Sequence, residues 1–353
     1  MCIRDSVYSE GDGYGRPFVF PIPNCHISDR VFTDSKISPL YTRLCELGSK
    51  GIPYFVFDRD SCNLSACCRL KFNFIPENID LAKMRFCGFQ NVTINLPACA
   101  YNSSNKEEMF SEIDRMLDLV IKAHIQKREL LKTTMKPGGT MWEMARPRNE
   151  LDGEPYINMD DAVYIVGIIG LNEAVKVRTG YELHENEDAF NFGLETIMHL
   201  SSIVKRKSQE CGLNLAIEET PAESATRRLA MIDSKRYRKA ITRGTESNPY
   251  YTNSIHFRAD APIDPITRLQ KQGYFHPMIE SGSIVHLFVG EKTIPTEGVK
   301  TLIRKVWENS TVTQMTLSPM FTLCSNCGRS IVGKANQCDC GMRLFKTLSM
   351  SAY

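Results

Sequence analysis

Short apolar runs alternate with longer segments of helical periodicity along nearly the whole chain, and this alternation restricts the fold more than any other feature. Extended segments are predicted at residues 18–24, 51–57, 65–74, 89–97, 213–219, 281–291 and 312–317. Helices are predicted around residues 41–47 and at 105–134, 187–210, 220–236 and 297–310. Strands that alternate with helices are typical of an α/β architecture whose sheet is largely parallel. We therefore expect an α/β fold.

The most apolar run is AVYIVGIIGL at residues 162–171, and it follows the acidic pair Asp160–Asp161. Acidic residues favour a helix start, and Lys176 and Arg178 stand before Gly180 as basic residues do at a helix end. We therefore predict one buried helix from the acidic pair to the glycine. The run is only about half of a membrane span, so it predicts no transmembrane helix.

Composition narrows the class of protein. The chain has 353 residues, of which 42% are hydrophobic, enough for one large core or two ordinary ones. Lys plus Arg number 43 against 41 Asp plus Glu, so no overall charge recruits nucleic acid or an anionic membrane. Thirteen cysteines, an odd number, without a secretory signal favour a reducing compartment and thiol or metal roles. We expect a cytoplasmic protein that binds neither membrane nor nucleic acid.

Cys67 and Cys68 stand side by side in the segment SACCRLKFNF. A disulfide between adjacent cysteines is strained, so we do not expect one. On a strand, Cys68 would share the apolar side with Leu70, and Cys67 the polar side with Arg69 and Lys71. The residues alone leave two interpretations open: small buried hydrophobic side chains, or a reactive thiol.

Four cysteines lie within 17 residues near the end of the chain: Cys324, Cys327, Cys338 and Cys340. Four thiolates at this density suit a closed, structural, tetrahedral Zn²⁺ site. The first pair has the usual C-x-x-C spacing, whereas the second is C-x-C. A structural zinc site is predicted, and a coincidence of cysteines is the alternative.

The segment ETPAES predicts an anion site at the end of a buried strand. With Thr220 as N-cap, Pro221 would be the first helical residue and Glu223 the third, which forms a capping box. Free N–H groups at such a helix start would face the end of the sheet, where α/β proteins take phosphate oxygens. The alternative is only a well-capped helix.

Uncharged polar groups elsewhere could hold a sugar. Asn95 lies on the polar side of the strand VTINLP, and a second group spans residues 250–254, YYTNS. Most polar residues on strands, however, simply face solvent or a neighbour. His286 stands alone in an apolar strand, and a core histidine is favoured there over a ligand or base.

Taken in order, FPIPN, GIPYF, CCRL, VTINLP, YIVGIIGLNEAV, EETPAES, YYTNSIH, SIVH and a closing C-x-x-C resemble the anaerobic, class III ribonucleoside-triphosphate reductases, a glycyl radical enzyme family. The resemblance covers about residues 17–341. It implies part of a ten-stranded α/β barrel made of two half-sheets over residues 7–320, and a zinc ribbon over 321–353. The first six residues, MCIRDS, fit no periodic pattern; they resemble a translated sequencing adapter and are left out of the fold prediction.

The resemblance also implies roles for individual residues. A cysteine of the CCRL segment matches the thiyl radical site that abstracts the 3′ hydrogen of the ribose; Cys68 is favoured and Cys67 is the alternative. Asn95 matches an active-site asparagine that hydrogen-bonds the ribose hydroxyls. The residues that match the substrate-phosphate loop are Thr220, Ala222, Glu223 and Ser224. The cysteine ribbon matches the family's zinc site.

The activity implied is that of an oxidoreductase, the reduction of ribonucleoside triphosphates to 2′-deoxyribonucleoside triphosphates, which serves DNA replication. The family uses a glycyl radical made by a radical S-adenosylmethionine activase with an iron–sulfur cluster, formate or a small redox protein as reductant, and bound ATP. The complete enzyme is expected to be a homodimer.

Two departures from the family stand out. The family stores its radical in an R-x-x-G-Y loop after the ribbon, whereas this chain ends in KTLSMSAY, and the N-terminal part of the barrel is not found. We expect a partial chain that is inactive alone. Two other functions are weighed: a glycyl radical acyltransferase of the pyruvate formate-lyase kind, which also uses adjacent cysteines, and a non-catalytic zinc-ribbon module that binds nucleic acid or protein.

Overall fold

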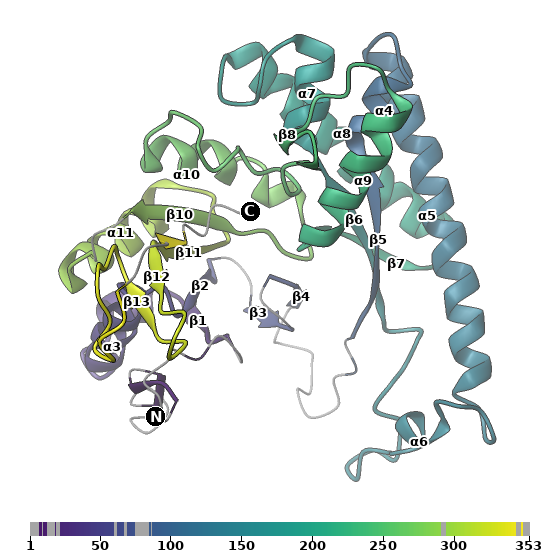
Figure 1. Cartoon of the computed structure of the whole chain (residues 1–353). Coiled ribbons are helices and arrows are strands. Elements are labelled where there is room, and N and C mark those ends of the chain that lie inside the picture. Colours follow the sequence, from purple (N-terminus) through teal and green to yellow (C-terminus); the bar gives the residue numbers. More distant parts are fainter. Residues whose placement is uncertain are drawn as a thin grey trace.

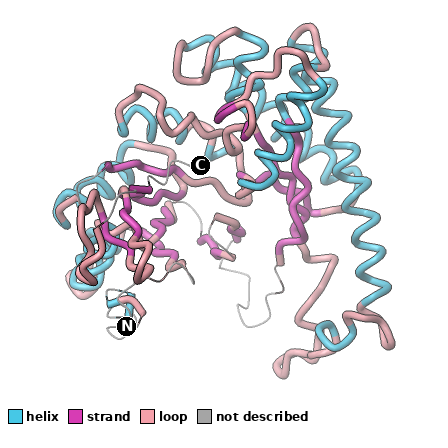
Figure 2. The backbone as a smooth tube through the Cα atoms, in the orientation of Figure 1, coloured by secondary structure: helices cyan, strands magenta, loops and turns pink. Residues whose placement is uncertain are grey.

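The structure is a computed structural model that describes residues 7–8, 10–12, 18, 22–59, 62–66, 69–74, 85, 87–290, 294–343 and 347–348. Its strands fall into two main groups, which Figure 2 shows apart from each other. One group is a three-stranded sheet and the other a four-stranded sheet, and each has its own hydrophobic core. The predicted α/β fold is confirmed. Within the described residues these sheets supply only part of the expected ten-stranded barrel.

The three-stranded sheet is parallel throughout and consists of β5 (Gly88–Asn95), β6 (Val163–Ile169) and β7 (Asn214–Glu219). Two long helices, α5 (Lys106–Thr134) and α8 (Glu187–Cys211), pack together against one face of it (Figure 1). Apolar residues at alternate strand positions, such as Ile94 and Ile168, point into this helical layer and are buried. The apolar faces of the strands and of the two helices therefore pack together in one hydrophobic core.

The predicted helix from Asp160 to Gly180 is wrong. Residues Val163–Ile169 form the central strand β6, buried along its whole length, and only Leu171–Thr179 form a helix, α7. A central strand of a parallel sheet is covered on both faces, so its sequence is apolar throughout and shows no period that distinguishes it from a buried helix. The β-branched residues of VYIVGII favour the strand. The helix end at Gly180 was predicted correctly, because Gly180 adopts φ +83.

The four-stranded sheet has the order β1-β2-β11-β10 and is parallel except where β11 meets β2. Helices α3 (Ser38–Gly48) and α11 (Thr296–Asn309) contact each other beside it. The strands are β1 (Asn24–Ile27), β2 (Tyr54–Phe57), β10 (Val285–Gly290) and β11 (Gln314–Pro319). The predicted helices and strands are present here, but β2 and β10 are shorter than predicted, β11 is shifted by two residues, and β1 starts at Asn24, where the predicted segment 18–24 ends.

Smaller elements complete the fold. The helices are α2 (Arg30–Thr33), α4 (Leu96–Tyr101), α6 (Trp142–Ala145), α9 (Glu223–Arg236), α10 (Pro265–Gly273) and the 3₁₀ turn η3 (His276–Met278). The hairpins are β3 (Cys62–Ser65) with β4 (Lys71–Phe74), and β8 (Arg243–Thr245) with β9 (Asn248–Tyr250). The final sheet contains β12 (Phe321–Leu323), β13 (Ser330–Val332) and β14 (Thr347–Leu348). In the described part of the chain, no helix combines the length and the apolarity that crossing a membrane requires.

A short segment before β10 joins the three-stranded sheet to the chain beyond the cysteine pair. Ser281 N–H donates to the carbonyl of Ile217 in β7 (2.9 Å), and Lys71 N–H donates to the carbonyl of Ser281 (3.0 Å). Gly282 adopts φ +125, and a Cβ on it would lie 1.8 Å from the carbonyl oxygen of Arg69. Only glycine permits this approach.

Candidate active site and metal centre

The face of the three-stranded sheet opposite the helical layer carries polar side chains. Asn91, Thr93 and Asn95 follow one another at every second position of β5 and therefore share this face. Asn91 Nδ2 donates to Glu218 Oε2 of β7 (2.8 Å). Figure 1 shows the three strands side by side, and parallel strands bring their carboxyl ends to one edge, where α/β sheets bind ligands.

Gly167 in the central strand makes room for this polar group. A Cβ there would lie 2.0 Å from Thr220 Oγ1 and 2.1 Å from Asn91 Oδ1. Thr220 Oγ1 lies 3.4 Å from Thr93 Oγ1 and donates to Asn91 Oδ1 at 3.5 Å. A larger residue than glycine at position 167 would therefore push the polar side chains apart.

The predicted capping box at ETPAES is wrong. Helix α9 begins at Glu223 with Ala222 as N-cap, and no side chain caps it. Thr220, which is 6% exposed, lies two residues before the N-cap and is too far from the helix start to cap it. Its hydroxyl instead contacts Thr93 and Asn91. Within the described part of the chain, the first N–H groups of α9 consequently have no capping side-chain acceptor. The predicted helix start beside a buried strand is nevertheless present, since β7 ends at Glu219.

Asn95 ends β5 and lies at the N-cap of α4, which starts at Leu96. Its side-chain Nδ2 donates to Asp233 Oδ2 on α9 (2.8 Å). Tyr251 OH donates to the same oxygen (2.9 Å). Asp233 and Tyr251 are 2% and 1% exposed. Sequence reasoning missed this contact, because the partners are far apart in the chain.

The YYTNS segment lies across the strand ends, and two of its hydroxyls bond within the fold. Thr252 Oγ1 donates to Glu173 (2.6 Å), and Ser254 Oγ donates to the carbonyl of Ile168 (3.1 Å). Gly170 N–H donates to the carbonyl of Thr252 (3.0 Å). The expectation that these hydroxyls hold a sugar is therefore not supported for Thr252 and Ser254; they fasten the edge of the sheet.

A buried ionic group adjoins the end of β7 and was missed by sequence reasoning. Glu219 is fully buried, accepts a hydrogen bond from Ile284 N–H (2.9 Å), and lies 3.9 Å from Arg69 Nη1 and 3.7 Å from His256 Nε2. Burial raises the pKa of Glu219 to about 7, although the charge of Arg69 opposes this. The sequence signal that could have revealed this buried ionic group is the acidic pair Glu218–Glu219 in an otherwise apolar strand.

The cysteine pair itself lies outside the described residues, as Cys67 and Cys68 do not belong to them. The neighbouring side chains are described. Arg69 and Lys71 were predicted on a polar side, yet each is 4% exposed, so this side is interior. His286 is also buried, and its pKa falls to about 3, mainly because burial disfavours the charged ring. It is a neutral core histidine, as favoured from the sequence.

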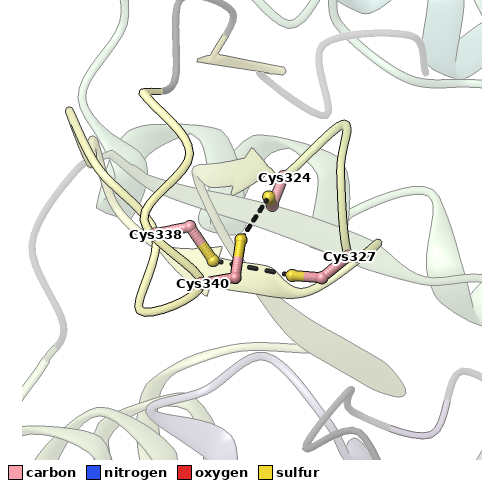
Figure 3. Close-up of side chains that lie close together, drawn as sticks. All are labelled: Cys324, Cys327, Cys338 and Cys340. Atoms are coloured by element: carbon pink, nitrogen blue, oxygen red, sulfur yellow. Dashed lines mark hydrogen bonds between the residues drawn. The ribbon is translucent and has the colours of Figure 1, made fainter.

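The four C-terminal cysteines lie on the loop between β12 and β13 and on the loop after β13. Figure 3 shows their side chains close together. The Sγ atoms of Cys324 and Cys340 are 3.6 Å apart, as are those of Cys327 and Cys338. Four sulfurs at about 2.3 Å around a tetrahedral Zn²⁺ are about 3.8 Å apart, so the arrangement fits this ion. The N–H of Met342 and the side chain of Asn326 lower the pKa of Cys340 to about 6, which favours the thiolate.

Comparison with known proteins identifies the family of the chain. A family profile described as anaerobic ribonucleoside-triphosphate reductase matches residues 5–348. The enzymes of that name from Haemophilus influenzae and Escherichia coli are 26% and 24% identical over 226 residues, which are 62% of this chain and 31% of each relative. The chain thus spans about a third of the length of these relatives.

Solved structures share the fold. The anaerobic ribonucleotide reductase of Thermotoga maritima in complex with dATP and CTP superposes with a TM-score of 0.71 at 18% identity, over 97% of this chain and 54% of that one. The same enzyme with MES in its active site gives a TM-score of 0.70 over 98% and 55%. The profile match extends over nearly the whole sequence, and the chain belongs to the anaerobic ribonucleoside-triphosphate reductase family.

Proposed function

We propose that this chain forms part of the active site of an oxidoreductase that converts ribonucleoside triphosphates to 2′-deoxyribonucleoside triphosphates for DNA replication. The observation that carries the proposal is the polar face of the three-stranded sheet. There Asn95, Thr93 and Thr220 gather at the carboxyl edge, next to the start of α9. A sugar and its phosphates need hydrogen-bond groups and N–H donors at adjoining places, and this edge offers both.

The phosphates bind in this proposal at residues 220–224. The N–H groups of Glu223 and Ser224 are among the first of α9 and have no intrahelical acceptor, and the helix dipole favours an anion there. Ala222 as N-cap leaves the approach free of a competing side chain. Thr220 orders the chain before the helix through its contacts above Gly167.

Asn95 faces the ribose hydroxyls, and Cys68 is proposed as the radical-bearing cysteine, with Cys67 as the alternative. The radical chemistry is supplied by a glycyl radical that a radical S-adenosylmethionine activase with an iron–sulfur cluster generates, with formate or a small redox protein as reductant. The described residues contribute substrate binding, orientation and an interior lined by Arg69 and Glu219.

The proposal also assigns the domains of the chain and the assembly of the complete enzyme. Residues 7–320 belong to the catalytic barrel and residues 321–353 to a ribbon closed by Zn²⁺ on Cys324, Cys327, Cys338 and Cys340. The complete enzyme is a cytoplasmic homodimer that binds ATP. Neither the acyltransferase nor the zinc-ribbon module without catalysis is supported by the family match.

The test is calorimetric titration of the chain with CTP, with coenzyme A thioester as the competing ligand class. We expect CTP to bind and Ser224→Pro to weaken it about tenfold or more, because proline removes one charge-assisted N–H donor yet is tolerated in a first helical turn. Ser224→Ala retains the N–H and should bind within about twofold of wild type. Binding of acetyl-CoA without CTP would overturn the proposal.

A further inference from the structure

Asn95 departs from the usual behaviour of an asparagine at a helix start. An N-cap asparagine normally accepts a hydrogen bond from the second or third N–H of its helix. Pro97, the second residue of α4, has no N–H, and the Asn95 side chain does not accept from the N–H of the third residue, Ala98. The side chain instead reaches across to α9. Asn95 therefore contacts Asp233 in place of forming a stabilising helix cap.

The contact fixes which way the amide points. A carboxylate oxygen can only accept, so the amide nitrogen must face Asp233 Oδ2, at 2.8 Å. The amide oxygen then points elsewhere, and the buried Asn95 Oδ1 has no hydrogen-bond partner among the residues that the structure describes. An unsatisfied buried acceptor is costly, and it requires an explanation.

Asp233 is itself held in place. It is 2% exposed, and its Oδ2 accepts a second hydrogen bond from Tyr251 OH at 2.9 Å. Tyr251 is 1% exposed. Asp233 lies on α9, and this helix begins at Glu223, close to Thr220. A single helix therefore both starts beside Thr220 and holds the Asn95 side chain.

We propose that Asp233 is a positioning residue that holds the Asn95 amide with Oδ1 free to accept a hydrogen bond from a hydroxyl of the bound ribonucleotide. The inference rests on the proposed function and adds to it the residue that sets the orientation of Asn95. Asp233 does not touch the substrate. It acts by removing the alternative amide rotamer, in which a donor would face the hydroxyl.

The first measurement is the side-chain amide signal of Asn95 in nitrogen-15 spectra of the whole chain, assigned by its loss in Asn95→Ala. We expect Asp233→Ala to shift this signal. Asp233→Asn keeps a carbonyl oxygen that can accept from Asn95, and should restore it. Tyr251→Phe is the matched control, because it removes the other hydrogen bond to Asp233. An Asn95 signal unchanged in Asp233→Ala would overturn the inference.

The second measurement is titration with CTP and its 2′-deoxy and 3′-deoxy analogues. Wild type should bind CTP about tenfold more tightly than at least one analogue, the effect of one hydrogen bond. Asp233→Ala should abolish this preference while the affinity for that analogue stays within about twofold, and Asp233→Asn should retain it. A merely structural role would weaken all three ligands equally, and that result would overturn the inference. If wild type bound none of them, the proposed function itself would fail, whatever the amide signal showed.

Discussion

The three-stranded sheet and the cysteine ribbon are stabilised in opposite ways. The sheet β5–β7 buries one face under α5 and α8 in a large apolar core. The ribbon β12–β14 has a cluster of buried side chains that consists of Cys324 and Cys338, with few apolar neighbours. A small segment that cannot bury enough apolar surface needs another source of stability, and we propose that Zn²⁺ on the four cysteines supplies it. The comparison teaches that the first region depends on packing, whereas in our proposal the second depends on a ligand.

The largest expected effect comes from removing a cysteine ligand. Cys338→Ser should lower bound zinc from about one ion per chain to none, because structural zinc sites contribute roughly 10 kcal/mol or more to folding. Zinc content and amide hydrogen exchange are the measurements. Exchange should accelerate in residues 321–343 and stay unchanged in β5–β7.

Cys211→Ser, in α8 and away from the ribbon, is the control for thiol loss. Retained zinc and retained protection in Cys338→Ser would show that the ribbon does not depend on four sulfurs.

A cavity in the sheet core should have the next largest effect. Ile168 in β6 is fully buried between the helical layer and its neighbouring strands. Ile168→Ala should cost about 2–5 kcal/mol of unfolding free energy, measured by denaturant unfolding. Ile232→Ala, at a site 47% exposed on α9, should change it by about 0.5 kcal/mol or less. Equal losses of unfolding free energy in the two variants would contradict the conclusion that this core stabilises the sheet.

The buried glutamate at the end of β7 should make the stability of the sheet depend on pH. The pKa of Glu219 is raised to about 7 by burial, so the native state holds a proton that the unfolded state releases from about pH 4.5. Unfolding free energy should therefore fall by up to about 3 kcal/mol as pH rises from about 4.5 to 7, and not further above it.

Glu219→Gln cannot ionise and should remove this part of the pH profile, which denaturant unfolding at several pH values would measure. An identical profile in the variant would mean that other groups titrate in this range. Arg69 and His256, which face Glu219, are the first to substitute in that case.

The smallest predicted changes in unfolding free energy concern the N-terminal ends of α5 and α9. Asn105 caps α5 by accepting from Glu108 N–H (2.8 Å), so Asn105→Ala should cost about 1 kcal/mol. Glu223 belongs to no capping box at α9, so Glu223→Ala, which removes the side-chain acceptor, should cost about 0.5 kcal/mol or less. Both values come from thermal unfolding. A loss near 1 kcal/mol for Glu223→Ala would restore the capping box predicted from the sequence.

The amino-acid sequence by itself determined the α/β class, the amphipathic helices α5, α8 and α11, and the four cysteines of the ribbon. These features are local: a helical period, a strand period and a spacing of ligands each lie within one segment. The sequence also indicated Asn95 and residues 220–224 as neighbours of a ligand, through the order of family motifs.

Only the tertiary structure decided what the fully apolar run and the polar side chains do. Residues 163–169 became a strand because β5 and β7 flank them, a fact that no local period can carry. Thr220 lost its predicted cap because its hydroxyl is engaged above Gly167. Asp233 gained its place beside Asn95 although 138 positions separate them. Contacts at such separation arise from packing, and packing is a property of the whole fold.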